Sequence, residues 1–285
     1  MTYRFEYYPA QSVNEAVALL AQYAGAELVA GCTNVIVDAR AERRIPTAVI
    51  DLNNLDDLRY ARREDGTVRL GPRTTLTDCF RLPFIRQDAP ILKLMAAEFA
   101  GTLIRNRATL AGNIAYASPA ADAAPPLLAL GAHLTLLSQA RGARTLAVSD
   151  FFVGPRKTQR VADELITEIS FPAASGISKS GYFKFALRNA MAISLVSGAV
   201  VLQMEGKKIR EARLALGAVA AKPYRVSQAE ELLRDQEPTD ALIREAANIA
   251  AASTSPIGDI RASAEYRREM TRVMTRRMIE QALAS

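Results

Sequence analysis

The sequence is poor in the residues that most often bind metals, form disulfides or act as acid–base catalysts. It contains two cysteines, one histidine and no tryptophan. Cys32 and Cys79 are too few for a disulfide framework or for an iron–sulfur cluster, which takes about four thiolates. His133 lies in a predicted strand and cannot assemble a catalytic triad by itself. We therefore predict no metal ligand and no catalytic side chain in this chain, and any iron–sulfur cluster must lie on a partner.

Long apolar runs are absent as well. No stretch of about 18 apolar residues occurs, and the first residues, MTYRFEYYPAQSV, carry charge and tyrosine where a signal peptide needs an apolar segment. A cytoplasmic protein is expected.

The net charge of +6 comes from scattered lysines and arginines, which argues against nucleic-acid binding. The densest group, YRREMTRVMTRR, has a helical spacing typical of a solvated helix face or a subunit contact.

The length of 285 residues predicts two or three compact units rather than one core. Ser12 and Glu15 have capping-box spacing at the start of a predicted helix. Short apolar runs over 27–30 and 47–52 predict strands on either side of a loop and a second helix. From Arg59 the pattern changes to short strands and then to a helix, which indicates a second unit.

The last third of the chain is predicted to be a separate domain. The segment PAASG, which ends at Gly176, is typical of a linker, and we place a domain boundary there. Residues 182–188, 193–204 and 209–219 alternate or run apolar, which predicts an antiparallel meander.

Helices are expected to complete this domain. Ser227 with Glu230 predicts one capped helix, and Thr239 predicts the start of another. The final helix is predicted from an apolar stripe formed by Tyr266, Met270, Val273 and Met278.

Two glycine-containing loops are the candidate ligand-binding segments of the sequence. In LVAGCTNVIVDAR, residues 28–40, Gly31 permits a close backbone approach, and Thr33 and Asn34 precede a predicted helix whose free N–H groups suit an anion such as pyrophosphate. By itself such a turn is a weak signal. The second loop, IRNRATLAGNIAYASPAADAAPPLLAL, is long, polar and rich in small residues, which is unusual for a passive connection.

The pair VAGCTNVIV and TLAGNIAYASPAAD resembles the two FAD-binding loops of the flavoprotein subunits of the molybdenum hydroxylases, which include xanthine dehydrogenase and carbon monoxide dehydrogenase. The resemblance continues, in the same order, through DFFVGPRKTQRVADELITEISFP, GYFKFALRNAMAIS and SPIGDIRASAEYRREM, and so covers nearly the whole chain. It is similar in particular to the separate flavin subunit of bacterial xanthine dehydrogenases.

The resemblance implies an α+β fold. An FAD-binding domain of the PCMH type, similar to vanillyl-alcohol oxidase, would occupy residues 1–175 as two subdomains, about 1–55 and 56–175. A domain like the C-terminal domain of carbon monoxide dehydrogenase flavoprotein, with an antiparallel sheet and helices, would occupy residues 176–285.

The resemblance also implies a set of FAD contacts, which lie on both loops and at several further positions. The first loop would wrap the pyrophosphate and ribityl chain through Leu28, Val29, Ala30, Gly31, Cys32, Thr33, Asn34 and Val35. The second would approach through Ala108, Thr109, Ala111, Gly112 and Asn113, with Ser118 nearby. Asp122 would bind the adenosine half, Ile166 would pack on the cofactor, Lys184 would lie near the flavin, and Phe99 would lie over the isoalloxazine.

Three departures from the family pattern matter. Cys32 replaces the second glycine of the common AGG form, and Ala111 replaces the first glycine of GGN. Either would weaken FAD binding if its position required positive φ, because a side chain disfavours that conformation. Met191 stands where some eukaryotic relatives carry an acid, so the handling of nicotinamide can differ.

The function implied is electron transfer. FAD, bound noncovalently, would receive electrons from a small [2Fe-2S] subunit and pass them to NAD+ or another acceptor, while a large subunit with molybdopterin carries out the hydroxylation. The assembly would be a dimer of heterotrimers.

Two alternatives stay open. A self-sufficient flavin oxidase would need its own acid–base group, which the scarcity of histidine disfavours. A flavin-binding assembly protein without turnover is the other alternative, and it would be favoured if the two substitutions abolished FAD binding.

Overall fold

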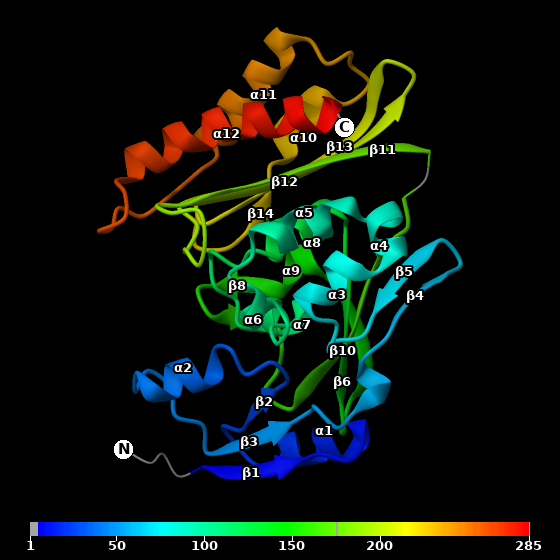
Figure 1. Cartoon of the computed structure of the whole chain (residues 1–285), viewed down its shortest axis with the longest axis vertical. Coiled ribbons are helices and arrows are strands. Elements are labelled where there is room, and N and C mark those ends of the chain that lie inside the picture. Colours follow the sequence, from blue (N-terminus) through cyan, green and yellow to red (C-terminus); the bar gives the residue numbers. More distant parts are fainter. Residues whose placement is uncertain (1–4, 175, 285) are drawn as a thin grey trace.

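The computed structural model describes residues 5–174 and 176–284. Three layers of structure follow one another along the long axis (Figure 1). A small parallel sheet lies at one end, a five-stranded antiparallel sheet with its helices lies in the middle, and a four-stranded antiparallel sheet under three helices lies at the other end. The α+β fold predicted from the sequence is confirmed.

The first part is built from three parallel strands in the order β1-β3-β2. Ser12 caps the first helix by accepting the N–H of Glu15, as predicted. Ala16, Val17 and Leu20 bury one face of that helix. The elements are β1 (Glu6–Pro9), α1 (Val13–Gln22), β2 (Glu27–Val29), α2 (Val35–Arg40), β3 (Ala48–Asp51) and the 3-10 turn η1 (Asp56–Leu58).

The middle part contains a five-stranded sheet in the order β4-β5-β10-β6-β7, with every neighbouring pair antiparallel. Its strands are β4 (Ala61–Glu64), β5 (Thr67–Leu70), β6 (His133–Ser138), β7 (Gly142–Ala147) and β10 (Glu164–Pro172), and a small hairpin adds β8 (Phe152–Gly154) and β9 (Lys157–Thr158). Its helices are α3 (Leu76–Arg81), α4 (Pro83–Asp88), α5 (Pro90–Glu98), α6 (Thr102–Arg105), α7 (Leu110–Ala115), α8 (Ala124–Ala129) and α9 (Val148–Phe151).

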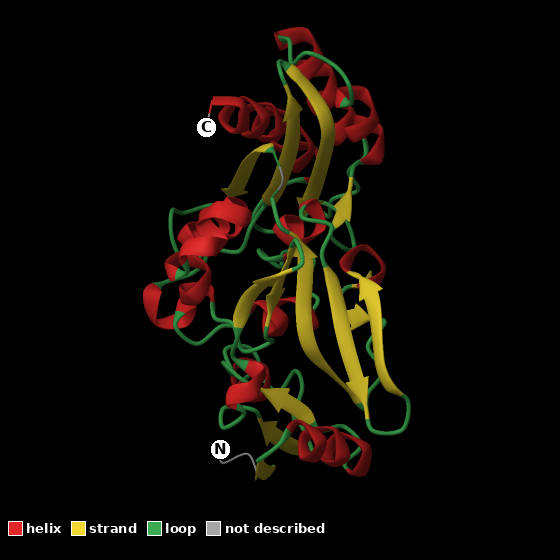
Figure 2. Ribbon diagram, turned by 90° about the vertical axis from the view of Figure 1, so that its right-hand side faces the viewer, coloured by secondary structure: helices red, strands yellow, loops and turns green. Residues whose placement is uncertain are grey.

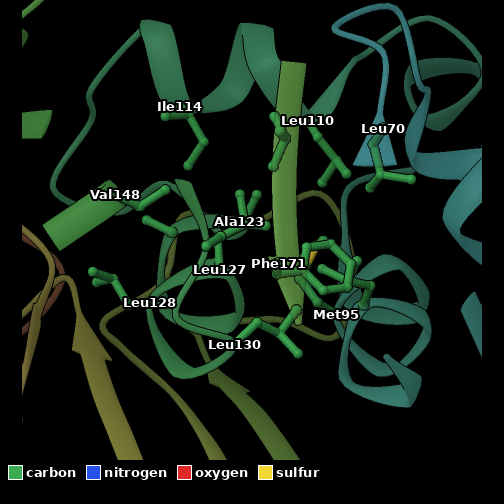
Figure 3. Packing of buried hydrophobic residues seen from close by; sticks show 14 of the residues in the cluster. Leu70, Met95, Leu110, Ile114, Ala123, Leu127, Leu128, Leu130, Val148 and Phe171 are labelled. Atoms are coloured by element: carbon green, nitrogen blue, oxygen red, sulfur yellow. The ribbon is translucent and has the colours of Figure 1, made fainter. Parts of the chain in front are cut away.

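Alternating apolar residues of the sheet pack against these helices to form the largest core. Leu70 of β5 and Phe171 of β10 meet Met95 of α5 and Leu110 of α7 (Figure 3). Alternation places every second strand residue on this face, while residues such as Arg69 point to the other. The buried face of the helix over 90–98 and the buried face of the strand over 164–172 therefore pack against each other in one core.

The last part is the predicted meander with helices on one face. The strands β11 (Ile177–Phe185), β12 (Val196–Glu205) and β13 (Lys208–Gly217) pair in succession, and the short β14 (Tyr224–Arg225) extends the sheet. The helices are α10 (Ser227–Leu233), α11 (Asp240–Ala252) and α12 (Ala264–Ala284). Figure 2 shows this sheet and the five-stranded sheet one beyond the other along the long axis, with the parallel sheet at the far end.

The meander is buried on both faces, which explains its nearly continuous apolar sequence. Ala199 and Val201 join the core of the middle part, while Val200 and Leu202 face the helices. Residues 186–188 and 193–195, predicted as strand ends, instead lie in the loop between β11 and β12.

Two predictions about the helices need correction. Ser227 is the first residue of α10 and makes no capping bond, because Glu230 accepts the N–H of Leu214 and pairs with Arg225 instead. On α12, Met278 is buried as predicted, but Tyr266 is exposed. The buried face of α12 also carries polar residues, namely Arg267, Thr271 and Thr275.

None of the helices in the described part of the chain combines the length and the apolar character needed to cross a bilayer.

Candidate functional site

The first loop connects β2 to α2 and exposes unpaired backbone donors. Within residues 5–174 and 176–284, no backbone carbonyl accepts a hydrogen bond from the N–H groups of residues 31–34. Asn34 precedes the first turn of α2 and makes no side-chain capping bond. A run of free N–H groups is a favourable environment for an anion.

Cys32 adopts the left-handed conformation, with φ of 56°. This is the conformation that a glycine would adopt without strain, so the substitution of the family glycine by Cys32 carries a conformational cost. Burial raises the pKa of the Cys32 thiol, which is therefore neutral near pH 7 and adds no negative charge to the loop.

The second loop leads into α7 and is fixed by hydrogen bonds to a neighbouring turn. Leu76 N–H donates to the carbonyl of Ala108, and Leu110 N–H donates to that of Thr74. Thr109 caps α7 by accepting the N–H of Gly112 at 3.0 Å. Ala111 lies inside α7, so the backbone at this position does not need a glycine.

The two loops touch each other at Gly31. A Cβ atom at this position would overlap the backbone carbonyl of Arg107, so no larger residue fits without separating the loops. Sequence reasoning assigned the small size of Gly31 to the approach of a ligand. The structure shows that Gly31 is also required for the contact with the second loop.

A polar cavity of about 180 Å³ lies where the loops meet. Arg73 is held there by bonds from its guanidinium to the carbonyl of Leu55 and to Asp56. The volume is below the range typical of whole-ligand sites and suits a group of the size of a pyrophosphate. The lining residues are Ala30, Gly31, Asn53, Arg59, Arg73, Thr75, Asn106, Arg107 and Thr109.

Asp122 and Lys184 form a buried ion pair between the middle and last parts of the molecule. Lys184 Nζ lies 2.7 Å from Asp122 Oδ2, and Ser194 Oγ donates to Asp122 Oδ1 at 3.0 Å. Burial raises the pKa of Asp122, and the charge of Lys184 opposes that shift. Asn113 approaches this group through its side-chain oxygen, which accepts the N–H of Ala123.

The remaining predicted contacts occupy different places. Phe99 follows α5 and is largely buried, with its carbonyl accepting a bond from Arg105. Ile166 lies in β10, opposite Leu136, and is buried in the same core. Ser118 accepts the N–H of Ala120 in the turn after α7. The structure thus brings the two loops together and pairs Asp122 with Lys184, whereas Ile166 is part of the core.

A cluster that sequence reasoning missed joins α2 to the end of α7. Tyr116 Oη donates to Asp38 Oδ2 at 2.9 Å, and Arg156 contacts both groups. Arg43 lies on the other carboxylate oxygen at 3.3 Å. Asp38 is buried, so these contacts hold the helix that follows the first loop against the helix that follows the second.

Asn53 was also missed, because the sequence predicts only that it ends a strand. Its amide donates to the carbonyl of Ala30 at 2.9 Å and to Asp51 at 2.6 Å, so it ties down the first loop. No motif marks Asn53, Arg59, Arg73 or Tyr116. Their bonds to Ala30, Asp78, Leu55 and Asp38, respectively, join residues that are distant in sequence.

Comparison with known proteins gives a consistent result. Residues 3–174 match the family described as the FAD binding domain in molybdopterin dehydrogenase, and residues 181–282 match the CO dehydrogenase flavoprotein C-terminal domain. The chain is 31% identical over 281 residues to the xanthine dehydrogenase FAD-binding subunit of Escherichia coli O157:H7, covering 98% of this chain and 96% of that protein. It is 32% identical over 282 residues to the carbon monoxide dehydrogenase medium chain of Hydrogenophaga pseudoflava, covering 99% and 98%.

Solved structures agree with these matches. The carbon monoxide dehydrogenase from Hydrogenophaga pseudoflava that lacks the Mo-pyranopterin moiety superposes with a TM-score of 0.96, at 32% identity over 100% of this chain and 99% of that chain. Quinoline 2-oxidoreductase from Pseudomonas putida 86 gives 0.93 at 27% identity, over 99% and 98%.

Proposed function

Because the chain belongs to the FAD-binding medium subunits of the molybdenum hydroxylases, we propose that it relays electrons through a noncovalently bound FAD. Electrons would arrive from a [2Fe-2S] subunit and leave to NAD+ or another acceptor. The observation that carries this proposal is the contact between the two loops at Gly31, which closes an arginine-lined cavity beside free backbone N–H groups. When bound, FAD supplies the redox chemistry, and the protein supplies binding, orientation and electrostatics.

The donor set of the loops fits the pyrophosphate of FAD. Residues 31–34 offer unpaired N–H groups, and Arg59, Arg73 and Arg107 line the adjoining cavity with positive charge. Hydrogen bonds between such donors and an anion are stronger than neutral ones. Cys32 keeps a neutral thiol in this loop, so no charge opposes the anion. We propose residues 28–35 and 108–113 as the phosphate and ribityl contacts.

The Asp122–Lys184 pair belongs at one end of the cofactor. The two side chains are joined at 2.7 Å, so Asp122 cannot serve the adenosine half while Lys184 serves the flavin. We propose that both lie at the isoalloxazine end, beside Phe99. The packing of α5, which ends just before Phe99, against β11, which carries Lys184, supports this placement.

At the isoalloxazine end, the role of Asp122 and Lys184 would be to hold a charge in a fixed position, without a proton transfer. Lys184 presents a positive charge within a buried region, and Asp122 and Ser194 fix its direction. A fixed cation near the flavin would favour negative charge on the ring system. Ile166 would then contribute only through packing, because its side chain is buried among core residues.

The proposed assembly places the hydroxylating centre on other chains. Within the described residues no group of three or more metal-binding side chains gathers, and both cysteines are free thiols. We propose a dimer of heterotrimers in the cytoplasm, where free thiols persist. We also propose that the domains divide near residue 175, between the FAD-binding part and the C-terminal sheet.

The direct test is to purify the chain, precipitate it with acid and identify the released flavin. We expect about one FAD per chain in the supernatant. FMN in place of FAD, or flavin that stays attached to the denatured polypeptide, would refute the proposal.

A further inference from the structure

We propose that the five-stranded sheet carries a second ligand site, which binds a small organic cation with an apolar body. A groove of about 530 Å³ lies on the face of this sheet that is turned away from its helices, next to the start of α1 and the turn η1. This volume falls in the range typical of small-molecule sites. In Figure 2 the sheet is seen with α1 below it.

The groove is shaped by the alternation of strand residues and by one β-bulge. Leu136 of β6 enters the core, so its neighbour Leu137 points to the opposite face and lines the groove. The register of β10 against β6 shifts between Ile166 and Glu168. Because of this bulge, Thr167 and Glu168 both line the groove. Bulges are common beside binding sites, where they redirect a side chain.

A fixed carboxylate forms the polar end of the groove. The side chain of Glu168 is largely buried, and it accepts from Tyr60 Oη at 3.0 Å and from the Arg69 guanidinium at 2.5 Å. Burial, and then the bond to Glu168, raises the pKa of Tyr60, so its hydroxyl stays a donor near pH 7. The two bonds reach different oxygens of Glu168, and each oxygen keeps a lone pair for a further donor.

The charges of the lining favour a cation. Asp57 and Glu168 bring two carboxylates into the groove against one guanidinium, that of Arg69. Arg69 also lies 3.7 Å from Glu64, which is outside the groove, so its charge is divided between two carboxylates. Asp57 is exposed and has no ion-pair partner in the described part of the chain. The groove therefore attracts an ammonium group and repels an anion.

The other end of the groove is apolar. Thr135 lies opposite Glu168, whereas Leu137, two residues further along β6, lies opposite Ala143 of β7. Leu137 packs against the core that α1 forms with its neighbours. A ligand with an apolar body at the α1 end and an ammonium group at the Glu168 end satisfies both parts. The apolar side chains of the lining are Val13, Leu58, Leu137 and Ala143.

The groove and the arginine-lined cavity lie on opposite sides of one chain segment, residues 57–60. Leu58 and Tyr60 line the groove, whereas Arg59 lines the cavity. Arg73, which also lines the cavity, donates its N–H to the carbonyl of Leu58 and so fixes this segment. The two sites share no lining residue, so the cation should bind while FAD is in place.

The test uses the full chain with its FAD and phenethylammonium as the probe. Titration calorimetry measures its binding, and phenethyl alcohol serves as a neutral probe of the same shape. Asp57→Asn and Glu168→Gln each remove one charge from the groove. Glu64→Gln is the matched control, because Glu64 also lies beside Arg69 but outside the groove. FAD content and melting temperature are measured for each variant.

We expect saturable binding of phenethylammonium with a dissociation constant of about 1 mM or below, and binding of phenethyl alcohol that is weaker by about tenfold or more. Asp57→Asn and Glu168→Gln should each weaken the binding of phenethylammonium about fivefold to tenfold, because a charge-assisted bond becomes a neutral one. Glu64→Gln should bind like the wild type. Added salt should weaken the binding, since Asp57 is exposed.

The absence of saturable binding would overturn the inference, as would equal binding of the two probes or wild-type affinity in both groove variants. If Glu168→Gln lowers the melting temperature, Asp57→Asn decides, because its side chain is exposed. The flavin measurement keeps this inference apart from the proposed function. A chain that binds phenethylammonium but holds no FAD would refute the proposed function and leave this inference standing.

Discussion

At the scale of single residues, two neighbouring positions of the first loop differ in whether they can carry a side chain. Gly31 must lack a side chain because the carbonyl of Arg107 occupies that space. Cys32 carries a side chain although its φ of 56° favours glycine. We expect Gly31→Ala to lower the flavin content of the purified chain severalfold, since the loops must separate by an amount that costs on the order of 1–3 kcal/mol. Absorbance of bound flavin per chain is the measurement.

Gly154→Ala is the matched control for this change. A Cβ at Gly154 meets no other atom within 4 Å, so the same chemical substitution is made without a steric conflict. Equal flavin loss in both variants would show that the contact between the loops does not support the cofactor site.

At the scale of elements, the site is held by contacts between helices rather than by the loops alone. Asp38 on α2 accepts from Tyr116 at the end of α7, and these residues are 78 positions apart in the sequence. We expect Tyr116→Phe to weaken FAD binding by roughly tenfold, because a hydrogen bond to a charged group contributes about 1.5–3 kcal/mol. Fluorescence titration of the apoprotein with FAD measures the dissociation constant.

Tyr60→Phe provides the comparison, because Tyr60 also donates to a carboxylate, that of Glu168, but at the five-stranded sheet. Its FAD affinity should stay at the wild-type value. An unchanged FAD affinity in Tyr116→Phe would mean that α2 and α7 hold their positions without the Asp38 contact.

At the scale of the whole molecule, the middle and last parts share one hydrophobic core, so we expect the chain to fold as one unit. Tyr182, Ala199, Val201 and Ala215 of the last part contribute to the core of the middle part. We expect the isolated chain with FAD to transfer electrons slowly from NADH to a dye, and to show no hydroxylation of purines or aldehydes. Both activities are measured on the same preparation by absorbance.

Adding the iron–sulfur and molybdenum subunits is the positive control, and it should restore hydroxylation. Hydroxylation by the isolated chain would reject the relay function and favour a self-sufficient oxidase.

The sequence by itself determined the features that depend on near neighbours or on a recognisable motif. Ser12 and Thr239 cap their helices as predicted, because an N-cap bond spans only three residues. The alternating strands of the meander and the two loops were likewise identified from local pattern and family resemblance. The family resemblance also correctly indicated the α+β fold and the FAD-binding subunit.

Only the tertiary structure decided which distant side chains meet. Lys184 pairs with Asp122 across 62 residues of sequence. Glu230 binds Leu214 instead of completing a cap with Ser227, because a partner on β13 was available. Arg267 is buried on α12 because it binds Leu195 and Asp259. Such pairings depend on how sheets and helices pack, and no spacing within the sequence encodes them.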